Sequence, residues 1–237
     1  MRIALASYEF KNKDVAFNLR QMERALKAVR GKAELLCFGE AFLQGFDALC
    51  WDHKIDLEIA LEQNSEPIRS ACALSEQYGV DLGFGYIERA GEDLYSSYAL
   101  IENGRPAHNY RRVSRGWKEY WRTDAHYREG DTVEGFLYRG ETVQLALCGD
   151  MWDYPERFRT NGLLLWPVYV NFSAEEWKAN EADYAAQAAL AADRVLLVDS
   201  LCRETEPDGV GGAFYFRGGR TVEKLPFGDE GILLVTL

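Results

Sequence analysis

The sequence predicts an α/β protein built in layers. Segments with the pattern of β-strands alternate with amphipathic helical segments along most of the chain. The C-terminal part contains strand patterns separated by turns. Of the 237 residues, 47% are hydrophobic, enough for a sizeable core without a metal or disulfide staple. No repeat, low-complexity stretch or linker divides the chain, so we expect one domain over residues 1–237.

The chain opens with the order strand, helix, strand. Residues 3–7 are apolar and bounded by polar residues, which predicts a short strand. Over residues 14–30, apolar side chains recur at steps of three and four and so share one helix face. Asp14 is the expected N-cap of this helix, and Gly31 is the expected stop. A second buried strand is predicted over residues 35–38.

The remaining elements continue the alternation. Ser65 is the expected N-cap of the next helix, with Pro67 in its first turn and Gly79 after its end. Gly218-Gly219 is the predicted turn of a late hairpin. The other predicted elements are strands over 81–88, 96–102, 142–148, 162–170 and 194–199, a helix over 174–192, and strands over 213–216, 221–225 and 232–237.

Composition excludes several classes of function. There are 27 Lys and Arg residues against 38 Asp and Glu, a formal net charge of -11, which argues against binding to nucleic-acid phosphates or anionic lipid. The five cysteines are an odd number without a C-x-x-C pair, which argues against a zinc ribbon or a complete disulfide framework. The sequence has neither a signal-peptide pattern nor an apolar run long enough to span a membrane, so we expect a soluble cytoplasmic protein.

We expect neither a metal site nor a bound cofactor. The three histidines, His53, His108 and His126, lack the spacing of metal ligands. The glycine-rich stretches 83–85 and 209–212 lack the spacing and following helix of a phosphate loop.

Three features that could carry chemistry lie at the ends of predicted strands: Glu40, Cys148 and the loop after Tyr110. Sheets of α/β proteins place their sites at the carboxyl ends of strands. Taken singly, Glu40 is interpreted more simply as a solvated carboxylate and Cys148 as a small core residue. Their combination is what indicates a site.

The local sequences around Glu40 and Cys148 resemble two motifs of the nitrilase, or carbon–nitrogen hydrolase, superfamily. FGEAFLQGF at 38–46 resembles the family's F-P-E-x-x-x-x-G-Y segment, and LCGDMWDYPE at 147–156 resembles its C-Y-D-x-R-F-P-E nucleophile segment. Further weak matches follow in the family's order at 83–86, 95–97, 103–104, 110–112, 165–167 and 211–213. The resemblance therefore extends along nearly the whole chain.

The resemblance implies a four-layer α-β-β-α sandwich and a homodimer. It also implies a Glu–Lys–Cys triad that hydrolyses a non-peptide C–N bond without a cofactor. Carried over, Glu40 is the general base, Cys148 is the nucleophile and the Gly149 N–H is an oxyanion donor. A second family glutamate falls near Glu119.

Two departures from the family pattern affect the expected site. Arg112 stands where the family has its catalytic lysine, and Arg differs from Lys in shape and reach. Lys118 lies on the same loop and either replaces that lysine or is an ordinary solvated residue. The nucleophile segment also has one extra residue, and Trp152 or Asp153 stands where amidases usually have Arg. Two aromatic clusters flank the site loops, Trp117/Tyr120/Trp121 and Trp152/Tyr154. Such clusters more often pack than recognise a ligand, but here their position predicts an aromatic-walled pocket.

The predicted function is a cysteine hydrolase of a small linear amide or carbamoyl compound that releases ammonia or an amine. One alternative is a degenerate member that binds a ligand or partner without turnover because of Arg112. Others are acyl transfer from the same thioester to an amine, and a nitrile substrate. A working Cys148 is expected to be an accessible thiol with a lowered pKa.

Overall fold

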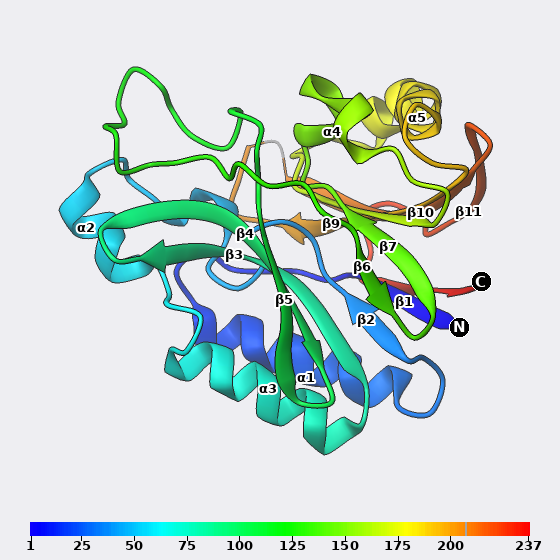
Figure 1. Cartoon of the computed structure of the whole chain (residues 1–237), viewed down its shortest axis with the longest axis horizontal. Helices are drawn as coiled ribbons and strands as arrows, with labels where there is room; N and C mark the ends of the chain where they lie inside the picture. Colours follow the sequence, from blue (N-terminus) through cyan, green and yellow to red (C-terminus); the bar gives the residue numbers. More distant parts are fainter. Residues whose placement is uncertain (207) are drawn as a thin grey trace.

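Two six-stranded β-sheets lie face to face, with helices on the outer side of each (Figure 1). The computed structural model describes residues 1–206 and 208–237. This order of layers, helix, sheet, sheet, helix, confirms the predicted α-β-β-α sandwich.

Each sheet has three parallel strands in its middle and antiparallel strands outside them. In the first sheet, β1 and β3 both run parallel to β2; in the second, β7 and β9 both run parallel to β8. The first sheet has the order β12 (Gly231–Thr236), β1 (Arg2–Ser7), β2 (Leu35–Cys37), β3 (Asp81–Ala90), β4 (Asp93–Glu102) and β5 (Arg105–Arg111). The second has the order β11 (Arg220–Lys224), β10 (Gly209–Arg217), β9 (Arg194–Cys202), β8 (Leu163–Val168), β7 (Glu141–Leu145) and β6 (Phe136–Tyr138).

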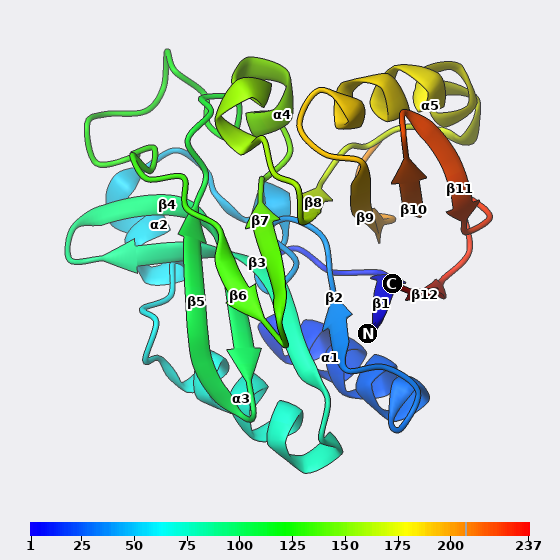
Figure 2. The same cartoon turned by 45° about the vertical axis from the view of Figure 1, so that its right-hand side comes forward.

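The helices cover the outer faces of the two sheets. Figure 2 shows α1 and α3 on one side of the molecule, and α4 and α5 on the other. These helices are α1 (Val15–Val29), α3 (Glu66–Tyr78), α4 (Asp150–Asp153) and α5 (Ala174–Ala189). The remaining helix of the described residues, α2, spans His53–Ile59. Two 3₁₀ turns span Phe46–Ala48 and Pro155–Phe158. None of the helices within residues 1–206 and 208–237 is long and apolar enough to cross a membrane.

The central strands are buried on both faces, which explains their continuous apolar sequences. In β1, Ile3 and Leu5 belong to the core between the two sheets, whereas Ala4 and Ala6 belong to the core beneath α1 and α3. Successive side chains of a strand point to opposite faces, so one short strand supplies both cores.

The predicted roles of Asp14, Gly79 and the hairpin turn are confirmed, whereas Ser65 stands at the predicted N-cap of α3 but its side chain makes no capping hydrogen bond. The Asp14 side chain accepts a hydrogen bond from the Phe17 N–H at 2.8 Å, and Gly79 ends α3 with a φ of 65°. Gly218 and Gly219 have φ values of 54° and 75°, the left-handed conformation that a two-residue hairpin turn requires.

The sequence analysis did not predict α2, α4, β5 or β6. β5 and β6 each form one edge of a sheet, and β5 begins with three exposed residues that include Pro106. β5 therefore lacks the apolar pattern that revealed the central strands, and β6 has only three residues, too few to show a pattern. β10 also begins earlier than expected, at Gly209, where the sequence is glycine-rich.

Tyr138 links the two sheets through a buried hydrogen bond, and we predict that Tyr138→Phe lowers stability without changing the active site. The Tyr138 hydroxyl in β6 donates to Asp81 Oδ2 in β3 at 2.7 Å, and Tyr138 is 1% exposed. Losing a hydrogen bond to a charged group is expected to lower the free energy of unfolding by about 2 kcal/mol, measured by urea denaturation. An unchanged unfolding midpoint would contradict this role for Tyr138.

Candidate active site

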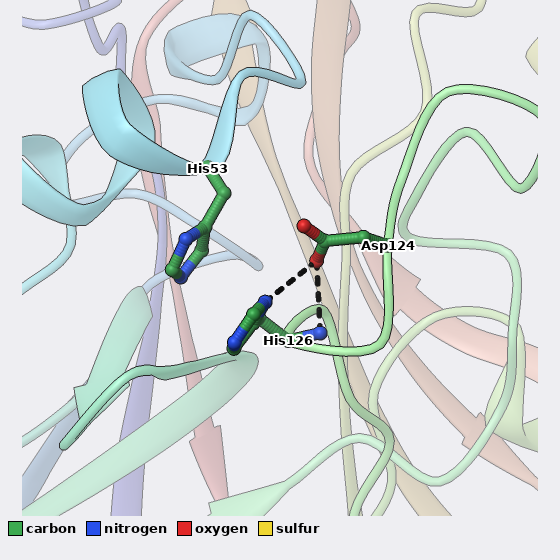
Figure 3. A group of neighbouring side chains, drawn as sticks. All are labelled: His53, Asp124 and His126. Atoms are coloured by element: carbon green, nitrogen blue, oxygen red, sulfur yellow. Dashed lines mark hydrogen bonds and ion pairs between the residues drawn. The ribbon is translucent and has the colours of Figure 1, made fainter.

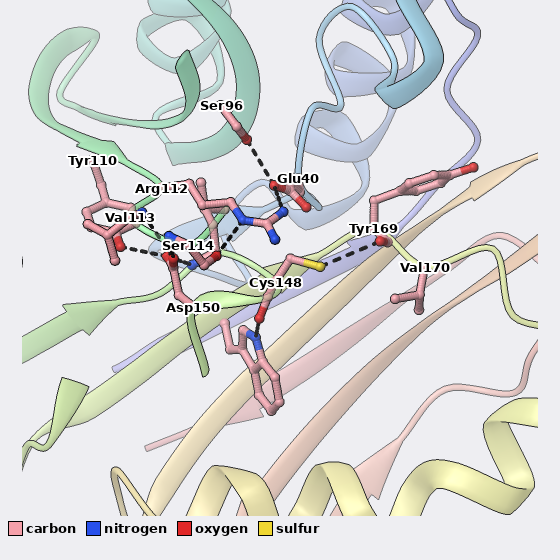
Figure 4. Close-up of polar contacts among 12 residues, drawn as sticks. Glu40, Ser96, Tyr110, Arg112, Val113, Ser114, Cys148, Asp150, Tyr169 and Val170 are labelled. Atoms are coloured by element: carbon pink, nitrogen blue, oxygen red, sulfur yellow. Dashed lines mark hydrogen bonds and ion pairs between the residues drawn. The ribbon is translucent and has the colours of Figure 1, made fainter. Parts of the chain in front are cut away.

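The carboxyl ends of the central strands bring Glu40 and Cys148 together between the two sheets, with Arg112 beside them (Figure 4). Glu40 follows β2 in the first sheet, and Cys148 follows β7 in the second. Arg112 follows edge strand β5 directly. The sequence-predicted positions at strand ends therefore converge in space.

Glu40 is held by backbone contacts to both sheets. Its N–H donates to the Val168 carbonyl in β8 at 3.1 Å, and Gly39 accepts a hydrogen bond from the Gly85 N–H in β3 at 3.1 Å. A Cβ atom at Gly85 would lie 2.6 Å from the Glu40 Cα and 2.3 Å from the Ala41 nitrogen. Because backbone atoms cannot move aside cheaply, only glycine at position 85 lets this segment approach β3.

One oxygen of the Glu40 carboxylate is bound and the other is not. Oε1 accepts hydrogen bonds from Ser96 Oγ and Arg112 Nη1, both at 2.9 Å. Oε2 is buried and has no hydrogen-bond partner among the described residues. Burying an acceptor without a partner is unfavourable, so this oxygen is available to accept a proton or a donor from a bound molecule.

Arg112 is a buried cation facing Glu40. Its side chain is 3% exposed, and its Nε donates to Ser114 Oγ at 2.7 Å. Burial by itself would lower the pKa of Arg112, but the neighbouring Glu40, Cys148 and Asp150 raise it above its usual value. The guanidinium therefore keeps its charge throughout the physiological pH range.

The Asp150 carboxylate ties the Arg112 loop to the Cys148 loop. Its Oδ1 accepts from the backbone N–H groups of Val113 and Ser114 at 3.1 and 2.7 Å. Its Oδ2 accepts from the Tyr110 hydroxyl at 2.6 Å and from the Leu147 N–H at 2.9 Å. One carboxylate thus fixes the residues on either side of Arg112 against the residue before Cys148.

Cys148 occupies a sharp turn that begins α4. Its φ of 42° lies in the left-handed region, which a residue with a Cβ adopts only when its surroundings enforce it. Its N–H donates to the Pro167 carbonyl, and its carbonyl accepts from Trp166 Nε1, both at 2.9 Å. The thiol donates to the Tyr169 carbonyl at 3.7 Å.

The environment keeps the resting Cys148 thiol protonated. Burial raises the pKa of Cys148 to about 12, and the charge of Glu40 adds to this, while Arg112 acts in the opposite direction. The sequence analysis expected a lowered pKa for a working nucleophile, but the pKa of Cys148 is raised, because a buried carboxylate and a low dielectric both disfavour a thiolate. A reaction at this sulfur needs a base that removes the proton during attack.

The sequence profile of the carbon–nitrogen hydrolase family matches residues 2–193. The chain belongs to this family.

Individual members resemble the chain at low sequence identity. An (R)-stereoselective amidase from Pseudomonas sp. is 26% identical over 165 residues, which are 67% of this chain and 55% of that protein. This chain therefore spans about 55% of the length of its curated relative. An amidase from Nesterenkonia sp. has a TM-score of 0.81 at 20% identity, covering 100% of this chain and 90% of that one. A superfamily protein from Xanthomonas campestris has a TM-score of 0.79 at 15% identity, covering 99% and 89%. The two solved structures share the fold of this chain.

Arg112 and Gly149 both differ from the family motifs, and the two residues lie against each other. Arg112 stands in place of Lys, and Gly149 stands where the C-Y-D motif has Tyr. A Cβ at Gly149 would lie 2.4 Å from Arg112 Nη2. Because Glu40 and Ser114 hold the guanidinium in place, it cannot swing away from this contact. The guanidinium fits over the residue after the nucleophile because that residue has no side chain.

Among the described residues, Lys118 and Glu119 have partners other than Glu40, Arg112 and Cys148. The Lys118 ammonium forms an ion pair with Glu129 at 2.8 Å and donates to the Tyr127 carbonyl. Glu119 is partly exposed, and its backbone carbonyl accepts from Arg122 and Thr123. Among the described residues, Arg112 is the cation that contacts Glu40, so the contacts favour Arg112 over Lys118 in the position of the family lysine.

The aromatic residues expected to line the pocket lie in different environments. Trp152 is 43% exposed and packs edge to face on Tyr184 of α5, with ring centroids 5.1 Å apart. Trp117 is buried against Tyr127, whereas Trp121 is 81% exposed. Trp152 therefore lines a hollow between α4 and α5, together with Phe172, Asn180 and Asp183.

The sequence analysis missed Ser96, Asp150 and Asp199 as members of the site. Asp199 in β9 is fully buried; its Oδ1 accepts from the Val170 N–H at 3.3 Å, and its Oδ2 has no partner among the described residues. Burial raises the pKa of Asp199 well above its usual value. The sequence does contain a pattern that could have revealed Asp199. An acidic residue follows the apolar run 195–198, much as Glu40 comes just after the apolar run 35–38.

We predict that the rate at which iodoacetamide alkylates native Cys148 keeps rising as the pH increases, without the midpoint near pH ~8.5 that a free thiol shows. With its pKa raised to about 12, the thiolate fraction rises about tenfold per pH unit from pH 7 to 10. In urea-unfolded protein the rate should level off above about pH 8.5. Peptide mass spectrometry resolves Cys148 from the other cysteines. A native midpoint below about 8.5 would contradict the protonated resting state.

We predict that the penalty of Gly149→Ala depends on Arg112. Gly149 has a φ of -62°, which alanine adopts readily, so the penalty reports the contact with the guanidinium. In the wild type the substitution should lower the free energy of unfolding by about 1–3 kcal/mol, and in an Arg112→Lys background by less than about 1 kcal/mol. Equal penalties in both backgrounds, measured by urea denaturation, would show that the two positions are independent.

Proposed function

We propose that the protein is a cysteine-dependent amidase that hydrolyses the non-peptide C–N bond of a small linear amide or carbamoyl compound. The observation that carries the proposal is the group formed by the buried Glu40 and Arg112 and the partly buried Cys148, a base, a fixed cation and a nucleophile. The amidase among its relatives and the amidase among the solved structures support an amide-type substrate.

The first step is attack by the Cys148 sulfur on the carbonyl carbon. Because the resting thiol is protonated, Glu40 removes its proton as the C–S bond forms, and the unpartnered Oε2 is the oxygen available to receive it. The carbonyl oxygen becomes an oxyanion. A preformed thiolate is not needed.

Arg112 stabilises the oxyanion. Nη1 and Nε are bound to Glu40 and Ser114, while Nη2 lies over Gly149, next to the nucleophile. A fixed cation in a site with little water stabilises developing negative charge without reorganising. The Gly149 N–H is the second proposed donor.

The tetrahedral intermediate then collapses and breaks the C–N bond. Glu40 returns the proton to the departing nitrogen, and ammonia or an amine leaves an acyl group on Cys148 as a thioester. Water attacks the thioester while Glu40 again takes a proton, and the carboxylic acid leaves with the thiol restored.

The test is a panel of small linear amides and carbamoyl compounds, with release of ammonia or amine as the readout. We predict that Cys148→Ala reduces turnover to background and that Glu40→Gln reduces it by about 100-fold or more. Arg112→Gln should lower kcat by about 100-fold, whereas Arg112→Lys should retain more activity because it keeps the charge.

Mass spectrometry of the intact protein tests the thioester directly. Acid quenching of the wild type during turnover should trap an acyl adduct on Cys148, whereas Glu40→Gln should form little adduct because it lacks the base for the first attack. Thioester decay that accelerates with added amine would instead indicate acyl transfer. Turnover that persists in Cys148→Ala would contradict the proposal.

Ligand binding without turnover is the second candidate function. The observation that favours it is the direct ion pair between Arg112 and Glu40, which occupies one oxygen of the base. Saturable binding of an amide, without release of product or an acyl adduct in any variant, would establish this function in place of hydrolysis.

A further inference from the structure

Two histidines and an aspartate from distant parts of the sequence form a cluster away from Glu40 and Cys148 (Figure 3). His53 is the first residue of α2, and Asp124 and His126 lie in the loop between β5 and β6. One potential ligand atom from each of the three lies within 4.8 Å of the others. The spacing of the histidines predicted no metal site, but the fold brings together residues that the sequence separates.

His53 is held in a state suited to binding a metal ion. Its Nε2 lies 2.7 Å from the Glu92 carbonyl oxygen, which only a protonated nitrogen can bond as a donor. When His53 is neutral, Nδ1 therefore carries the free lone pair. Metal-binding histidines commonly donate their other N–H to a backbone carbonyl, which fixes the ring and its tautomer.

Asp124 and His126 form the other half of the cluster. His126 Nδ1 and Asp124 Oδ1 are 3.0 Å apart, and the same carboxylate oxygen accepts from the His126 N–H at 2.9 Å. Two ligands of a tetrahedral zinc ion with bonds of about 2.0 Å are separated by about 3.3 Å. The existing separation is therefore close to that of two ligands on one ion.

The backbone around the cluster is already fixed. The His126 carbonyl accepts from the Leu94 N–H at 2.8 Å, and the neighbouring Tyr127 hydroxyl donates to Asp56 Oδ2 in α2 at 2.6 Å. Arg122 also donates to the Cys50 carbonyl at 2.9 Å. These contacts hold the loop against the start of α2, so binding would not require ordering of the backbone.

We propose that His53, Asp124 and His126 bind a divalent transition-metal ion such as Zn²⁺ at the junction of α2 and the β5–β6 loop. Two imidazoles and one carboxylate suit zinc and its neighbours, whereas Ca²⁺ and Mg²⁺ prefer all-oxygen ligand sets. Three protein ligands leave the fourth tetrahedral position to water.

Binding requires the His126 ring to turn, whereas the His53 ring keeps its hydrogen bond to the Glu92 carbonyl. The rings of His53 and His126 are stacked, with centroids 4.1 Å apart and planes 15° apart, so their nitrogens do not yet point at one place. The His126 and Asp124 side chains are 45% and 56% exposed, and this exposure gives them room to turn. On binding, coordination of the metal ion by the two histidines would replace the stacking of their rings.

Zinc titration of the chelator-treated protein, followed by calorimetry, tests this site. We predict that the wild type binds one equivalent of Zn²⁺ and that His53→Ala and His126→Ala each weaken binding at least tenfold. Asp124→Asn should weaken zinc binding by a similar factor. The asparagine side-chain oxygen can still accept the hydrogen bond from the His126 N–H, so this variant keeps the turn. Circular dichroism checks that each variant is folded.

Two matched variants distinguish this site from other zinc ligands. His108→Gln removes the third histidine, which stacks on Phe136 elsewhere in the fold, and Cys148→Ser removes a thiol. Both should bind Zn²⁺ as the wild type does. No binding of Zn²⁺ by the wild type, or binding that survives both His53→Ala and His126→Ala, would overturn the proposal.

Discussion

The geometry of the site depends on the buried carboxylate of Asp150. It accepts hydrogen bonds from a side chain of the first sheet, from two backbone groups after β5 and from one backbone group before Cys148. Because both oxygens are used, a displacement of either loop would leave buried donors or acceptors without partners. The positions of Arg112 and Cys148 relative to one another follow from this one interaction.

The second constraint is the buried ion pair of Arg112 and Glu40. Removing two charges from water is unfavourable, and the loss is offset here by direct contact and by further hydrogen bonds from Ser96 and to Ser114. The planar guanidinium spreads its donors over Glu40, Ser114 and the surface of Gly149. A lysine has a single ammonium and could not make these contacts together, so Gly149 and Arg112 are best understood as one structural unit.

Several groups at the site are held in unfavourable states. Cys148 has a left-handed backbone, its thiol is protonated by burial, and one oxygen each of Glu40 and Asp199 is buried without a partner among the described residues. Such features lower the stability of the folded chain and persist where the surrounding structure enforces them. Buried polar groups without partners suit a site for a polar substrate, because the substrate can supply the missing partners.

The layered α/β fold, the central strands and the family motifs around Glu40, Arg112 and Cys148 could all be predicted from the amino-acid sequence. These are local features: apolar runs, helix caps and residues at strand ends. The contact of Arg112 with Glu40, its approach to Gly149 and the buried carboxyl groups of Asp150 and Asp199 came from the three-dimensional fold. It also brought His53 beside Asp124 and His126 and reversed the expected direction of the Cys148 pKa. Burial and the contacts between loops of different sheets decide these properties, and neither is a property of a short stretch of sequence.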